Sequence, residues 1–277
     1  MKNFLISFVF AAALFLPAFG ANLPPVNDGN HHGDPPYLLE DGWKPLLNGK
    51  NLDGWQYRHP ERGGWTTTSA IYWGGPGNPR LLKARNNQGG RIVNTATDFK
   101  PVPSDLVTEE KFEDVELYLE FMVSDKSNSG VYLHGLYEIQ IWDSYGRTLG
   151  ELDNHITNIC GAVYNYERQT DRAKPGGIAP KVRAERPTGQ WQSFHIWFQA
   201  PRFGEKGNKI ANAKFLRVLH NGVLIHENIE REGPTTAAMK HPEAAANPLM
   251  LQGDHGPIAY RNIYIRPLRQ LSQTVWQ

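Results

Sequence analysis

The sequence is poor in several features that would place it in a familiar class. Cysteine occurs once, at Cys160, so no disulfide can form within the chain. We interpret this residue as a small buried hydrophobe and not as a catalytic thiol. An excess of charge of one sign is also lacking, since the chain has 29 Lys and Arg residues and 28 Asp and Glu residues. This balance argues against nucleic acid as a partner and suits a neutral ligand.

Long hydrophobic runs are confined to the N-terminus. Lys2 is followed by a mostly apolar run over residues 4–16 and by Ala18-Phe19-Gly20. This pattern predicts a signal peptide over residues 1–20, too short to span a membrane as a helix. No second run of this kind follows. We therefore expect a periplasmic or secreted bacterial protein without a membrane span.

Long helical periodicity, a Gly-rich phosphate loop and a Gly-x-Ser-x-Gly nucleophile elbow are absent too. Present instead is alternation with a period of two, as in residues 191–198 and in residues 115–121, where one face of the strand should be wet. Asn221-Gly222 supplies a turn pair for a hairpin over residues 217–227. The 27 Gly and 20 Pro punctuate these strands. Together they predict an all-β protein, an antiparallel sandwich or jelly roll.

Composition divides the chain into four segments. After the signal peptide, residues 21–42 form a Pro- and Gly-rich linker in which we interpret His31-His32 as solvated. Residues 43–268 hold the strands, and residues 269–277 are a short tail. Two irregular insertions interrupt the domain, residues 66–93 with Tyr72-Trp73-Gly74-Gly75-Pro76 and residues 170–190 with several Lys and Arg. Such loops either form the rim of a binding site or have no role in binding, and both interpretations stay open.

The most informative stretch runs from residue 128 to residue 143 and has the pattern of two short strands in a hairpin. The second strand alternates between an apolar face and a face carrying Glu138, Gln140 and Trp142. A carboxylate, an amide and an indole in a row are the side chains of a sugar-binding groove. The alternative is that Glu138 and Gln140 are ordinary solvent-facing residues.

Further short motifs follow one another along nearly the whole domain. In chain order they include Leu47-Asn48-Gly49-Lys50, Gly54-Trp55, Phe112-Glu113-Asp114, Asn128-Ser129-Gly130, Tyr137-Glu138-Ile139-Gln140, Cys160-Gly161-Ala162, Gly189-Gln190-Trp191, His220-Asn221-Gly222, Gln252-Gly253-Asp254-His255-Gly256 and Tyr260-Arg261-Asn262. This order, over about residues 43–268, resembles the 3-keto-disaccharide hydrolase domain family. The resemblance implies a concanavalin-like jelly-roll sandwich of two curved antiparallel sheets, with a ligand groove on the concave face.

The resemblance also implies a secreted bacterial enzyme that cleaves 3-keto-glycosides or 3-keto-disaccharides. A ketone at C3 acidifies the proton on C2, so a base can remove it and the C1 substituent can leave by elimination. Water then adds to the unsaturated ketone. Such a site needs a base, a stabiliser for the enolate oxygen and an acid for the leaving group. An upstream sugar 3-oxidoreductase of the same pathway would supply the substrate.

Three residues are candidates for catalysis. Glu138 is the first choice as base or metal ligand, and His255 is the best acid–base outside the hairpin. His134 points away from Glu138 if Gly135-Leu136 is a strict two-residue turn, and a longer loop reverses this. Asp143 would reach the Glu138 face only through a bulge near the end of the strand.

Five residues are candidates for substrate binding: Asn128, Gln140, Tyr164, Gln252 and Arg261. Arg261 could hold the enolate oxygen or form a structural ion pair, and Tyr164 could stack on a sugar or join the core. No cofactor is certain, but a divalent metal ion held by Glu138, His134 or His255 could stabilise the enolate as a Lewis acid. Imidazole with carboxylate suits zinc, manganese or cobalt better than calcium.

Two other functions compete with this interpretation. A retaining β-glucanase of the same fold uses a Glu-x-Asp-x-x-Glu strand with two carboxylates roughly 5 Å apart, but here Gln140 and Asp143 replace the later acids. A non-catalytic, lectin-like module would use the eight Trp and eleven Tyr for stacking on sugars. A flat aromatic strip would favour binding alone, whereas a pocket that ends in Glu138 with a histidine would favour chemistry.

Overall fold

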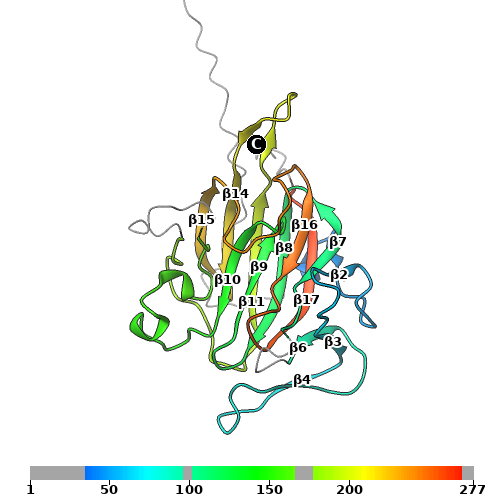
Figure 1. Ribbon diagram of the computed structural model, residues 1–277, viewed down its shortest axis with the longest axis vertical. Coiled ribbons are helices and arrows are strands. Elements are labelled where there is room, and N and C mark those ends of the chain that lie inside the picture. Colours follow the sequence, from blue (N-terminus) through cyan, green and yellow to red (C-terminus); the bar gives the residue numbers. More distant parts are fainter. Residues whose placement is uncertain (1–34, 96–101, 166–176, 270–277) are drawn as a thin grey trace, which may run out of the picture. The chain divides into compact units, whose positions relative to one another are not determined.

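The structure is a computed structural model that describes residues 35–95, 102–165 and 177–269 (Figure 1). The described residues from 35 to 268 belong to one compact unit. The predicted signal peptide, the His31-His32 pair and nearly all of the predicted tail lie outside the described residues. No helix in the described part of the chain is long and apolar enough to cross a membrane.

Two antiparallel sheets form the domain (Figure 1). The eight-stranded sheet has the order β15 (Val223–Arg231), β14 (Ala213–His220), β11 (Gln192–Gln199), β8 (Val115–Val123), β17 (Ile258–Pro267), β6 (Arg91–Asn94) and β3 (Trp65–Thr68), with β1 (Lys44–Pro45) paired to β17. The five-stranded sheet has the order β10 (Tyr137–Trp142), β9 (Asn128–Leu133), β16 (Asn247–Leu251), β7 (Leu106–Phe112) and β2 (Trp55–Tyr57). These sheets confirm the predicted all-β, antiparallel class.

Short elements complete the described chain. They are the helix α1 (Pro36–Leu39), the 3₁₀ turns η1 (Gly150–Leu152) and η2 (Ile156–Asn158), and two small hairpins, β4 (Ile71–Trp73) with β5 (Leu82–Ala84) and β12 (Arg202–Phe203) with β13 (Lys209–Ala211).

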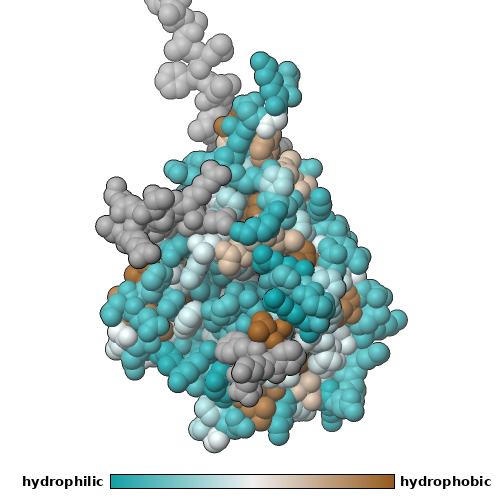
Figure 2. Space-filling model, in the orientation of Figure 1, coloured by the Kyte–Doolittle hydropathy of each residue, from teal (hydrophilic) through white to brown (hydrophobic). Residues whose placement is uncertain are grey.

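The core lies between the two sheets and follows the alternation along the strands. Leu117, Leu119 and Phe121 of β8 and Ile139 and Ile141 of β10 are fully buried members of one apolar cluster. Burying an aliphatic or aromatic side chain contributes roughly 1.5–3 kcal/mol. The face in Figure 2 shows hydrophobic residues in small separate groups among hydrophilic ones. The large apolar side chains of these strands therefore lie in the core between the two sheets.

Both predicted hairpins are present. Asn221 and Gly222 link β14 to β15 with φ of 51° and 81°, as a type I′ turn requires, so this prediction is confirmed. The hairpin of β9 and β10 is confirmed as well, with the longer of the two links that the sequence left open. Leu133 pairs with Tyr137, which leaves a three-residue loop whose first two residues have φ of 57° and 64°.

The predicted wet face of residues 115–121 is also wrong, because every residue of β8 is buried. Glu116 accepts hydrogen bonds from Arg266 and His195, both at 2.7 Å. The segment around α1 covers this outer face of the eight-stranded sheet: the Tyr37 ring stacks on Tyr264 with centroids 3.9 Å apart, and Glu40 pairs with Arg266 at 2.5 Å. Charged residues here bind the N-terminal segment to the sheet.

Candidate functional site

The site is built on the face of the five-stranded sheet that points away from the core, which we call the site face. Strand register aligns two rows of residues across it. The first row is Glu138, Tyr132, Met250, Val107 and Gln56, on neighbouring strands in that order. The second row is Gln140, Gly130, Gln252, Asp105 and Arg58, joined by strand pairing and by the backbone hydrogen bonds Gln252 N to Gly130 O and Arg58 N to Asp105 O. Residues far apart in the sequence therefore meet on one surface.

Glu138 occupies the end of the first row and is only 2% exposed. Its carboxylate lies directly over Gly130, because a Cβ built on that glycine would stand 2.2 Å from Glu138 Oε1 and 2.9 Å from Tyr132 Cε2. Burial raises the pKa of Glu138 to about 8, the hydrogen bond from Tyr132 lowers it, and the nearby carboxylates Asp105 and Asp254 raise it further. A carboxyl group in this state can exchange a proton near neutral pH.

The backbone around Glu138 explains why the side chain is buried. Residues 160–164 run along the β10 edge, with Gln140 N donating to Ala162 O at 2.8 Å and Tyr164 N to Glu138 O at 3.2 Å. Glu138 N donates to Thr235 Oγ1 at 3.1 Å, and the buried Arg231 donates to Tyr164 O at 2.7 Å. The Arg231 cation lowers the pKa of Glu138, though by less than burial raises it. Residues 160–164 and the segment that contains Thr235 thus cover the β10 edge of the site face.

Asp254 and His255 form a hydrogen-bonded ion pair in the turn after β16. The bond to Asp254 is the largest cause of a raised pKa at His255, which favours the imidazolium form. Gln252 Nε2 lies 3.4 Å from His255 Nδ1, and Asn128 N donates to His255 O at 3.1 Å. The His255 side chain is 52% exposed, so it can reach a ligand that enters from solvent.

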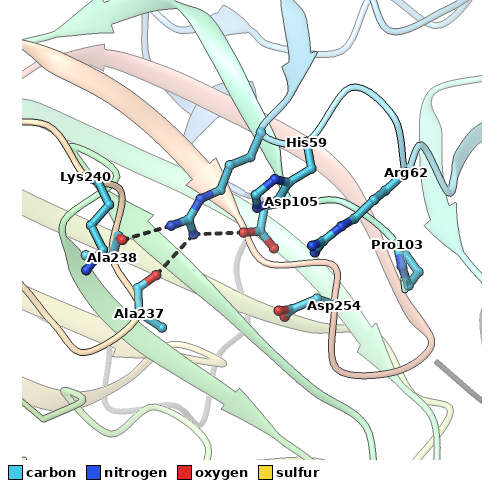
Figure 3. A pocket seen from close by; sticks show the side chains of 9 residues that line it. His59, Arg62, Pro103, Asp105, Ala237, Ala238, Lys240 and Asp254 are labelled. Carbon is cyan, nitrogen blue, oxygen red and sulfur yellow. Dashed lines mark hydrogen bonds and ion pairs between the residues drawn. The ribbon is translucent and has the colours of Figure 1, made fainter. Parts of the chain in front are cut away.

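A cavity of about 210 Å³ opens beside this pair (Figure 3). Arg58 crosses one side of it, donating to Asp105 Oδ2 at 3.1 Å, to Ala237 O at 3.1 Å and to Ala238 O at 3.0 Å. Burial raises the pKa of Asp105, and Asp254, which lines the same cavity, adds to that shift. Asp254 thus connects this cavity to His255, whereas Glu138 is not among the residues that line it.

Three of the predicted amides share one feature. Asn128 Oδ1, Gln140 Oε1 and Gln252 Oε1 are buried and have no hydrogen-bond partner among the residues described. A buried acceptor without a partner costs roughly 1–3 kcal/mol, so it calls for a donor from elsewhere. Hydroxyl groups of a sugar would supply such donors.

Other predicted residues lie outside this group. His134 bonds through Nε2 to Glu113 O at 3.1 Å, and its ring packs 5.2 Å from that of Phe198, because its positive φ turns the side chain toward the core. Arg261 is on the outer face of the other sheet, paired with Glu120 at 2.5 Å. Asp143 accepts from Lys126 N, Arg147 and Thr188. These placements favour structural roles for all three.

Tyr164 and Cys160 lie on the covering segment. Tyr164 is half-buried, and burial together with Glu138 raises the pKa of its hydroxyl. This places the ring near the Glu138 carboxyl and leaves a role in substrate contact open to it. Cys160 is fully buried, and burial raises the pKa of its thiol, as expected of a small core residue.

The donors for a metal ion do not converge in the described chain. No group of three or more His, Cys, Asp or Glu side chains there could hold an ion. The three candidate ligands lie in different places: Glu138 is on the site face, His255 is in the turn after β16, and His134 faces the core. The described residues therefore do not fit the predicted metal site.

Sequence reasoning missed five members of the site: Arg58, Asp105, Gly130, Tyr132 and Asp254. Two of them were within reach, since Gly130 and Tyr132 alternate along β9 on the same face as Asn128. Asp254 stood in the same short motif as His255. No local sequence pattern indicated Arg58 and Asp105, because the hydrogen bond between them joins residues that are 47 positions apart in the sequence.

Comparisons with known proteins give a family and a fold. Residues 42–266 match the family described as 3-keto-alpha-glucoside-1,2-lyase-like domain. Two solved structures from Parabacteroides distasonis, provisionally assigned as glycosyl hydrolases, are similar at 24% and 22% identity with TM-scores of 0.52 and 0.50. Each covers 82% of this chain, which covers 84% and 99% of them. No curated protein matches. The likeness confirms the predicted jelly-roll sandwich.

Proposed function

Because the chain belongs to the 3-keto-alpha-glucoside-1,2-lyase-like domain family, we propose that it cleaves 3-keto-glycosides by elimination, with Glu138 as base and His255 as acid. Family and fold make it a carbohydrate-active protein of the glycosyl hydrolase-like kind. The observation that carries the finer proposal is the environment of Glu138, a buried carboxyl on a face with unpartnered amide acceptors and an Asp–His pair.

The reaction follows from the ketone at C3. The Glu138 carboxylate takes the C2 proton, and the electron pair of that bond forms the enolate of the C3 ketone. The enolate then forms the C1–C2 double bond as the C1–O bond breaks, and the leaving oxygen takes a proton from the His255 imidazolium. The amide oxygens of Asn128, Gln140 and Gln252 can accept from the ring hydroxyls, and the amide NH2 groups of these residues can donate to the enolate oxygen. Addition of water to the unsaturated ketone completes a net hydrolysis.

The placement of Asp143 disfavours the β-glucanase alternative. A retaining mechanism needs a second carboxylate facing the first across the glycosidic bond. Asp143 is the later acid on this strand, but its two oxygens are occupied by Lys126, Arg147 and Thr188. Among the residues of β10, Glu138 is therefore the acidic residue that lies on the site face.

The test is a comparison of matched substrates. We expect release of the aglycone from a 3-keto-α-glucoside and none from the unoxidised parent, because a C2 proton without the neighbouring ketone is too weakly acidic for a carboxylate to remove. The measurement is product release by chromatography. Equal turnover of both would support a glycosidase, and saturable binding without turnover of either would support a lectin-like module.

The pH dependence should be bell-shaped. Below about pH 8 Glu138 takes up a proton and loses its basicity, so activity rises with pH through that value. The descending limb comes from His255, which must keep the proton that the leaving oxygen needs, and the raised pKa of His255 moves this limb to higher pH. His255→Gln should turn the bell into a rise to a lower plateau.

A second variant tests the ascending limb of that profile. Tyr132→Phe removes a hydrogen bond that lowers the pKa of Glu138, so the midpoint of the limb should move to higher pH. Initial rates from pH 5 to 10 check both variants. An unchanged ascending limb in Tyr132→Phe would contradict the assignment of Glu138 as base.

Export and supply are further parts of the proposal. The pattern over residues 1–20 supports export to the periplasm or beyond. A 3-keto-glycoside must be made by oxidation of a C3 hydroxyl, so an upstream sugar 3-oxidoreductase would act before this protein. Fractionation of the producing cells tests the first statement, and reconstitution with such an oxidoreductase tests the second.

A further inference from the structure

The two insertions that interrupt the strand pattern meet at a second groove, of about 400 Å³. The first insertion contributes Trp73, Pro76 and Pro79, and the second contributes residues 187–190. Asp125 and Tyr145, from the segments that flank the β9–β10 hairpin, complete the lining. Four stretches of chain therefore build one hollow, of a size that falls in the usual range for small-ligand sites.

This groove is separate from the site face. Trp73 packs against a small cluster formed by Leu82, Val93, Met122 and Ala259. Met122 and Ala259 alternate with core residues of β8 and β17, so they lie on the outer face of the eight-stranded sheet. Glu138 lies on the outer face of the other sheet. A ligand in the groove would not touch the catalytic residues.

The walls of the groove are held in place. Trp73 Nε1 donates to Pro79 O at 2.7 Å, and its ring packs against Gly189, where a Cβ would stand 2.4 Å from the indole. Asp125 N donates to Pro79 O at 2.9 Å and its carboxylate accepts from Arg147 at 2.8 Å. A preorganised site loses little entropy on binding.

The chemistry of the lining selects the ligand. Tyr145 lines the groove and is 51% exposed, so its ring can stack on a ligand and be buried by it, and Trp73 adds the part of its indole that borders the groove. Asp125, Thr188 and Gln190 offer oxygen and amide groups beside those rings. Asp125, the carboxylate among the lining residues, is already held in an ion pair with Arg147, which also pairs with Asp143. Aromatic faces next to hydroxyl-bonding groups fit a neutral sugar.

We propose that this groove is an accessory carbohydrate site that binds a short neutral oligosaccharide independently of the 3-keto position. It would hold the protein near a glycan whose oxidised ends reach the site face. The inference adds to the proposed function but does not depend on it, because unoxidised sugar rings should bind here without being cleaved.

The experiment measures binding of maltohexaose and of cellohexaose to the full chain by titration calorimetry. We expect one of them to bind, and Tyr145→Ala to weaken that binding by about tenfold while turnover of a small 3-keto-glucoside stays within twofold of wild type. Tyr72→Ala is the matched control: Tyr72 is 54% exposed on the first insertion but does not line the groove. It should bind like wild type.

Each other outcome overturns the inference. Absence of binding for both probes would show that the groove holds no sugar. Equal binding by wild type and Tyr145→Ala would place the sugar elsewhere, and so would loss of binding in Gly130→Ala, which alters only the site face. Loss of small-substrate turnover in Tyr145→Ala would make the groove part of the catalytic site. The binding result stands whether or not 3-keto-glycosides prove to be substrates.

Discussion

Glu138→Gln should lower turnover of a 3-keto-glucoside by roughly 10²–10⁴-fold, the usual contribution of a general base. The amide keeps the shape of the side chain and can still bond to Tyr132, but it cannot take a proton from C2. Single-turnover rates with saturating substrate measure the loss directly.

The same substitution should leave the protein folded and change how its stability depends on pH. In the folded state Glu138 holds its proton up to about pH 8, whereas the ordinary value of a glutamate is 4.5. The stability associated with this group is fully present below pH 4.5 and is lost as pH rises toward 8. Glu138→Gln removes that loss, so its melting temperature should match wild type near pH 4.5 and exceed it at pH 8.

Glu109→Gln is the matched control for both measurements. Glu109 is an exposed glutamate on β7 of the same sheet, so its replacement removes one negative charge without touching the site. It should keep wild-type turnover and a wild-type pH dependence of melting. Wild-type turnover in Glu138→Gln would refute the role of Glu138 as base. A steep loss of melting temperature at pH 8 would refute its burial as a protonated acid.

The burial of Glu138 marks the limit of what the sequence could predict. Alternation along residues 137–142 correctly separated the core side chains from Glu138 and Gln140, since the period of a strand is set by local geometry. Alternation says only that these residues face away from the core. Whether that face is wet depends on residues 160–164 and on Thr235, which cover the edge of the sheet from elsewhere in the chain.

The placements of Arg261 and His134 have similar causes. Arg261 precedes Asn262, which has a φ of 49° at an irregularity in β17, and it faces outward with Glu120, its direct partner on β8. Such pairing across strands cannot be read from one strand alone. A link longer than two residues was expected to turn His134 toward the Glu138 face, and this expectation is wrong: the loop has three residues, but His134 has a φ of 57° and its ring packs against Phe198. Alternation along a strand does not fix the conformation of a loop residue. Motif order, in contrast, was informative, because the resemblance to the family is confirmed by the match over residues 42–266.

Gly130→Ala should reduce turnover by at least about 100-fold, the loss that a displacement of about 1 Å can cause in a catalytic group. The added methyl would stand 2.2 Å from Glu138 Oε1, so the carboxylate must leave its place and Tyr132 must shift with it. Overpacking of this kind costs typically 1–3 kcal/mol, which the fold should survive. Turnover and thermal melting are measured side by side.

A glycine with open space around it separates this effect from the general effect of losing a glycine. A Cβ on Gly90 would meet no atom within 4 Å, and its φ is not in the left-handed region, so Gly90→Ala should keep both turnover and melting temperature. Wild-type turnover in Gly130→Ala would mean either that Glu138 can act as the base from another position or that it is not the base. If turnover falls and the ascending limb of the pH profile also moves, the methyl has altered the surroundings of the base itself, because Gly130 carries no group that titrates.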